Sequence, residues 1–176
     1  MKKLVLAAAI VCVAAISNAA ALQWGLSGIQ ASPDVAAADL AGSVAYFMDG
    51  ADYAAFSELD GDKVGAFAAE NALYSATVQA GRGGALGVTA TSGTYNAGDT
   101  VSGFIVVFDN ADSTAAKNYV ATGVDTKTVP GSGNLQFSKL YGTDTGAWQS
   151  TAVPEPTSGL LLLLGVAGLA LKRKRA

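Results

Sequence analysis

The sequence predicts a mainly β protein: an antiparallel β-sandwich-like exported domain with a short helical insertion, flanked by a signal peptide and a C-terminal transmembrane helix. Three observations predict this class. Short runs of β-branched and aromatic residues with a period of two are separated by Gly- and Asp-rich turns. A stretch within residues 52–71 has helical spacing instead. Both ends of the chain carry charge-free apolar runs beside basic residues.

The N-terminus has the three parts of a secretory signal peptide. Lys2 and Lys3 supply the positive start, and an apolar run follows from Leu4 to Ile16. Two small-x-small cleavage patterns come next, one ending at Ala19 and one ending at Ala21. Residues 1–21 are therefore interpreted as a signal peptide read by the Sec translocon, and the mature chain is predicted to begin after Ala19 or Ala21.

Residues 22–142 are expected to form the exported β-rich domain. The strongest strand lies in Val101–Phe108, where apolar side chains alternate on both faces, so both faces are expected to be covered. The other expected strands are Trp24–Ile29, Ser43–Met48, a strand from Leu73 onward, Leu86–Thr91, Tyr119–Val124, Lys127–Val129 and Leu135–Tyr141. Several short strands at this spacing are typical of an antiparallel sandwich.

The helical insertion has a start signal and an apolar face. Asp52 stands where a helix cap is expected, and Tyr53, Phe56 and Leu59 recur every three residues. A second short helix is expected around Phe67. Together these features predict two short helices within residues 52–71.

Composition excludes several function classes. Without the signal peptide and the tail's basic residues, five basic residues remain against all 14 acidic ones, a formal charge of −9. Such a surface repels nucleic acid and anionic lipid. The chain has no His, and its single Cys lies in the signal peptide. Triad catalysis and the usual zinc sites need those residues, so we predict no enzyme, no cofactor, no metal site and no catalytic residue.

Two stretches of the chain contain candidate ligand sites. Asp60-Gly61-Asp62 begins like a calcium loop, but Val64 and Asn71 occupy positions where oxygen-rich ligands are needed, so a solvated turn is expected. Residues 143–152 are interpreted as a linker of small polar residues. Trp148 within that stretch is the candidate ligand-binding aromatic, since packing does not explain it, whereas Tyr46, Tyr53 and Tyr74 fit apolar patterns and are expected in the core.

The tail, residues 153–176, has three parts in a fixed order. Pro154, Glu155 and Pro156 form a stiff extended element because each proline fixes its own φ. Residues 159–171 carry no charge and would form roughly 20 Å of helix, short of the ~30 Å hydrocarbon core. The basic end is expected in the cytoplasm. The predicted membrane anchor comprises Leu160, Leu161, Leu162, Leu163, Leu164, Leu169 and Leu171, and the predicted basic stop comprises Lys172, Arg173, Lys174 and Arg175.

This tripartite tail resembles the PEP-CTERM protein-sorting signal of exported proteins in Gram-negative bacteria. The resemblance covers about 23 residues of 176 and implies recognition of Pro154–Pro156 by an exosortase, a membrane enzyme thought to process the tail during export. The alternative is an ordinary single-pass membrane anchor. The chain is expected to be exported through the inner membrane and, after tail processing, to lie in the cell envelope, at the cell surface or in the extracellular matrix.

The leading functional hypothesis is a non-enzymatic cell-surface or extracellular-matrix protein, associated with a biofilm or exopolysaccharide. The alternative is a carbohydrate-binding adhesin module that uses exposed aromatics such as Trp148. The predicted partners are the exosortase, the Sec translocon, an exopolysaccharide and the membrane through the C-terminal helix.

Overall fold

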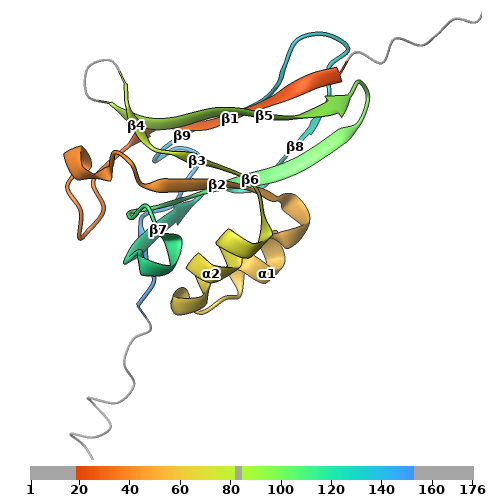
Figure 1. Cartoon of the computed structure of the whole chain (residues 1–176). Helices are drawn as coiled ribbons and strands as arrows, with labels where there is room; N and C mark the ends of the chain where they lie inside the picture. The colour runs from red at the N-terminus through yellow and green to blue at the C-terminus, as the bar shows by residue number, and fades with distance from the viewer. Residues whose placement is uncertain (1–18, 82–84, 153–176) are drawn as a thin grey trace, which may run out of the picture.

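The computed structural model describes residues 19–81 and 85–152, and it confirms a mainly β architecture with short helices. Figure 1 shows two sheets stacked one above the other, with the helices α1 (Tyr53–Ser57) and α2 (Gly61–Asn71) beneath the lower sheet. The described residues therefore form three layers: sheet, sheet and helices.

The upper sheet contains the first long strand of the domain at its centre. Its strands run in the order β4 (Gln79–Ala80), β5 (Leu86–Asn96), β1 (Ala19–Ile29) and β9 (Leu135–Leu140). β1 is antiparallel to β5 but parallel to β9. The prediction of a purely antiparallel sandwich is therefore wrong at this edge. A period of two reports which side chains are buried, and it carries no information about the direction of the neighbouring strand.

The lower sheet is antiparallel throughout its described pairings. The strand order is β10 (Gln149–Ser150), β7 (Asn118–Ala121), β6 (Thr100–Phe108), β2 (Val44–Asp49) and β3 (Ala72–Thr77), with β8 (Asp125–Thr128) also on β6. β6 lies at the centre of the sheet. It pairs with β2 on one side, and on the other with β8 along its first half and with β7 along its second half.

β6 is covered on both faces, as its sequence predicts. Phe104, Val106 and Phe108 pack in the cluster shared with the helices. Ile105 and Val107 point the other way, into the core between the two sheets. Each of these five side chains is at most 1% exposed, which explains why this strand is apolar along its whole length.

The core between the sheets is built around aromatic rings. The Phe47 ring on β2 lies 5.8 Å from that of Trp24 on β1 and 5.2 Å from that of Phe137 on β9. Leu22, Leu26 and Leu135 fill the same layer and are fully buried. Burial of each such side chain contributes about 1.5–3 kcal/mol, so this layer is the main stabilising element of the domain.

The predicted helical insertion is confirmed. A 3-10 turn, η2 (Gly50–Asp52), leads into α1 (Tyr53–Ser57), and α2 (Gly61–Asn71) follows. The Phe56 ring lies 5.2 Å from that of Phe104, which fixes α1 on the lower sheet. Asp52 occupies the cap position of α1 without a side-chain hydrogen bond, whereas Asp49 accepts one from the Ala51 amide and caps η2.

Two further 3-10 turns, η1 (Ala37–Leu40) and η4 (Ser113–Ala115), lie in the connections. Among the described residues, none of the helices combines the length and apolar character needed to cross a membrane. The predicted transmembrane helix, residues 159–171, lies outside the described residues, as does most of the predicted signal peptide.

Candidate functional site

The predicted sorting residues all lie outside the described part of the chain. These are Pro154, Glu155 and Pro156, together with the leucines of the anchor and the terminal basic residues. The site is therefore built from the residues that carry the chain out of the domain towards the motif.

The chain leaves the domain through an exit strand, which we define as β10 together with Thr151. β10 pairs antiparallel with β7, and the Tyr119 hydroxyl donates a 2.6 Å hydrogen bond to Oε1 of Gln149. The Thr151 amide donates to the carbonyl oxygen of Lys117 at 2.8 Å, and its hydroxyl donates to that of Ala116 at 2.5 Å. The stretch 143–152, which is predicted to be a linker, thus ends in residues that paired backbone and side-chain groups hold on the domain.

The start of α2 packs closely against the exit strand. A Cβ on Gly61 would lie 2.7 Å from the carbonyl oxygen of Ser150 and 3.0 Å from the carbonyl carbon of Thr151. A side chain therefore does not fit at residue 61. This contact gives Gly61 a packing role within the Asp60-Gly61-Asp62 stretch.

Asp60 in that stretch forms an ion pair at the protein surface. Asp60 accepts a 2.6 Å hydrogen bond from Lys63, and this bond and the lysine charge lower the pKa of Asp60. Both side chains are more than half exposed, so the pair contributes little to stability. Among the described residues, no three His, Cys, Asp or Glu side chains are grouped so that they could hold a metal ion.

Trp148 is half-buried, and packing does explain its position. Its indole Nε1 donates a 3.3 Å hydrogen bond to the carbonyl oxygen of Gln30, and its ring centroid lies 6.5 Å from that of Tyr141. Both aromatic side chains pack against the core between the sheets. The remaining exposed part of this aromatic pair is the surface on which a ligand could stack.

Tyr46, Tyr53 and Tyr74 are partly buried against the two cores, as predicted. Tyr74 also lies 3.4 Å from Tyr95, hydroxyl to hydroxyl, on the neighbouring sheet. Burial and this hydrogen bond raise the pKa of Tyr95 to about 12.

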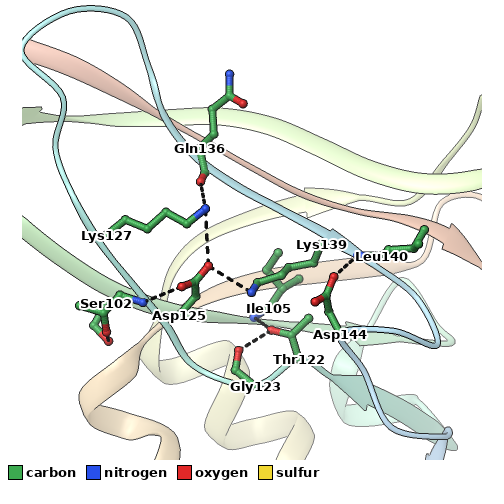
Figure 2. A network of polar contacts seen from close by, with 11 residues as sticks. Ser102, Ile105, Thr122, Gly123, Asp125, Lys127, Gln136, Lys139, Leu140 and Asp144 are labelled. Carbon is green, nitrogen blue, oxygen red and sulfur yellow. Dashed lines mark hydrogen bonds and ion pairs between the residues drawn. The ribbon is translucent and has the colours of Figure 1, made fainter.

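A cluster of charges joins the two sheets at the β8–β9 side (Figure 2). Oδ2 of Asp125 on β8 lies 3.1 Å from Nζ of Lys139 on β9 and 3.5 Å from Nζ of Lys127. The Lys127 ammonium also donates to the carbonyl oxygen of Gln136 at 2.7 Å and sits 5.4 Å from the centroid of the Phe137 ring. Two cations thus neutralise one carboxylate while tying β8 to β9.

The electrostatics of Asp125 follow from this geometry. Partial burial by itself would raise the pKa of the carboxyl group. The hydrogen bond and charge of Lys139, together with the charge of Lys127, outweigh burial and hold the pKa below its ordinary value. Asp125 therefore stays ionised as a structural link between the sheets, and it is not poised to exchange a proton near neutral pH.

A second polar centre, at Asp109, was not predicted from the sequence, which indicates only a strand end there. Asp109 is 6% exposed and accepts four hydrogen bonds. The donors are the Ser32 hydroxyl, the Asn118 side-chain amide, and the backbone amides of Lys117 and Asn118. The Asn118 side chain also reaches the Asp34 carboxylate at 2.7 Å. This hub fixes the start of β7, on which the exit strand is built.

Comparison with known families identifies the segment that follows the exit strand. A family model described as a PEP-CTERM protein-sorting motif matches residues 152–175. The tail is a PEP-CTERM sorting motif. Such a motif implies an exosortase as the processing partner and export to the cell envelope or surface. No curated protein and no solved structure matches this chain.

The PEP-CTERM match begins at Ala152, the residue after Thr151, and the Ala152 amide donates a 3.1 Å hydrogen bond to the Ser150 hydroxyl of the exit strand. The described domain and the matched sorting motif are therefore adjacent in sequence.

Proposed function

We propose that this chain is a non-enzymatic cell-surface or extracellular-matrix protein, delivered as a folded domain by its PEP-CTERM motif. The observation that carries the proposal is the sorting motif, matched at residues 152–175. Pro154, Glu155 and Pro156 are the residues that the exosortase reads, and the leucines and terminal basic residues hold them at the right depth in the membrane. Association with an exopolysaccharide or biofilm matrix is part of the same proposal.

The geometry of the exit strand supports presentation of the motif close to the domain. Covalent geometry limits the distance from Thr151 to Pro154 to about 11 Å. An enzyme that binds Pro154 therefore meets the surface formed by β10, β7 and the start of α2. The exit strand is only two paired residues plus Thr151, so its release requires the loss of few hydrogen bonds.

The chemistry of the chain supports a role without catalysis. The chain contains no His, and its single Cys, Cys12, lies in the predicted signal peptide. The two best-connected carboxylates, Asp109 and Asp125, accept hydrogen bonds or ion pairs that fix strands in place. Both carboxylates therefore stabilise the folded domain by holding strands in place.

Replacement of the motif tests the proposal. The double variant Glu155→Ala with Pro156→Ala, made in the full chain and expressed in a host that has an exosortase, should accumulate as an unprocessed form retained in the membrane. The parent should be processed and released. Cell fractionation followed by intact mass measurement distinguishes the two forms.

Glu58→Ala is the matched control, since Glu58 is an exposed glutamate on the domain far from the motif in sequence. This variant should be processed like the parent. If the double variant is also processed and released like the parent, the tail acts only as an anchor and the proposed recognition is wrong.

A second candidate function is carbohydrate binding by an adhesin module, favoured by the adjacent rings of Tyr141 and Trp148 at the surface. Aromatic faces of this kind stack on sugar rings. On a glycan array, the exported protein should then show saturable binding that Trp148→Ala abolishes. A matching thermal unfolding curve for the variant would show that the loss is not due to unfolding.

A further inference from the structure

We propose that the bond between Ala19 and Ala20 is the cleavage site of the signal peptide, and that the mature chain begins at Ala20. The sequence leaves two sites open, after Ala19 and after Ala21. The fold distinguishes them, because β1 begins at Ala19 and contains both positions.

Burial along the start of β1 separates the two products. Ala19 is exposed and lies opposite Asn96 on β5. Ala20 is 2% exposed, lies opposite Tyr95 and belongs to the core between the sheets. Cleavage after Ala19 removes only the exposed residue, whereas cleavage after Ala21 also removes a core side chain and two positions of the β1–β5 ladder.

The new charge gives a second argument. Hydrolysis adds one water across the amide bond: the carbonyl side leaves as a carboxylate on the signal peptide, and the nitrogen becomes an α-ammonium on the mature chain. Cleavage after Ala21 would place that ammonium on Leu22, which is 0% exposed and paired with Ser92 on one side and Leu135 on the other. An ionised group in such a layer is strongly disfavoured.

Cleavage after Ala19 places the ammonium on the nitrogen of Ala20, two residues before Leu22 and next to the exposed Ala19–Asn96 end of the strand. The Ala20 side chain is buried, but among the described strands Ala20 pairs with β5 alone, whereas Leu22 is enclosed between β5 and β9. Because Ala20 is buried and paired in the folded domain, the peptidase reaches this bond only before β1 joins the upper sheet. Removal of the signal peptide therefore precedes completion of the fold.

Two variants of the full chain distinguish the sites. Small residues are needed one and three positions before the cut bond. Ser17→Glu therefore blocks cleavage after Ala19 and leaves the pattern ending at Ala21 intact. Ala21→Gln does the reverse, and Ala21 is only partly buried, with its partner Thr94 exposed, so the strand accommodates the change.

N-terminal sequencing of the exported protein is the measurement. We expect the parent and Ala21→Gln to begin at Ala20, and Ser17→Glu to lose this product, either by keeping the signal peptide or by starting at Leu22. A parent that begins at any other residue overturns the proposal. So does loss of the Ala20 product in Ala21→Gln, or its persistence in Ser17→Glu.

Discussion

Replacement of Asp109 by Ala should destabilise the domain more than any change at a surface carboxylate. The variant removes the acceptor of four hydrogen bonds: two from backbone amides, one from the Ser32 hydroxyl and one from the Asn118 side chain. Ser32 and Asn118 are 7% and 3% exposed. In the variant, the hydroxyl of Ser32 and the side-chain amide of Asn118 therefore lose their carboxylate acceptor at a buried position, where water has little access.

The magnitude follows from the number and burial of these donors. An unsatisfied buried donor costs about 1–3 kcal/mol, and the vacated volume lets water reach some of them, so the total loss should be about 3 kcal/mol. For a domain of this size, that corresponds to a fall in Tm of about 10 °C. Asp109→Asn should cost about half as much. Its oxygen can still serve the two backbone amides, but its NH₂ group faces the NH₂ group of Asn118.

Thermal unfolding of the exported protein, followed by circular dichroism, measures this effect. Asp39→Ala is the matched control, because Asp39 is an exposed aspartate on η1 and its loss should leave Tm within about 2 °C of the parent. If Asp109→Ala also stays within that range, the buried hub does not hold β7 in place and the reasoning is wrong. If Asp109→Asn is as unstable as Asp109→Ala, the two backbone bonds contribute nothing.

Three further predictions concern charge and packing. Asp125→Asn should cost about 1 kcal/mol in urea unfolding at pH 7. Because the pKa of Asp125 is lowered in the folded state, the parent loses this contribution as the pH falls below about 4, so the difference in stability between parent and variant should shrink in acid. Tyr95→Phe should reduce the loss of folding stability at alkaline pH. A tyrosine in the unfolded chain ionises near pH 10, whereas the pKa of Tyr95 in the folded domain is about 12. The parent therefore loses stability as the pH rises from about 10 to 12, and the variant lacks this contribution. Gly65→Ala should lower the free energy of unfolding by about 2 kcal/mol, because the new Cβ would collide with the carbonyl oxygen of Ser113. Gly146→Ala is the control: a Cβ there meets open space, so this variant should be near neutral in the same unfolding assay.

Three strands and the two α-helices of this protein follow from local sequence, whereas β4 and β10 were not predicted and β1 begins five residues before its predicted start. β2, β6 and β9 lie within about two residues of the predicted ranges, because alternating burial leaves a period of two in the sequence. The prediction that both faces of β6 are buried needed only the continuous apolar run of that strand. The sorting motif is also local: its proline element, apolar run and basic end are contiguous, so it is recognised without any fold.

The tertiary structure decided everything that joins distant segments. The parallel pairing of β1 with β9 brings together residues more than a hundred positions apart, and no periodicity specifies such a partner. The exit strand depends on acceptors at Ala116 and Lys117, so residues 143–152, which look like a polar linker in isolation, are held by groups that the local pattern does not include. The Asp109 hub likewise collects donors from Ser32 and Asn118 at separations of 77 and 9 residues. Hydrogen bonds and burial depend on proximity in space, whereas propensity and periodicity describe only neighbours along the chain.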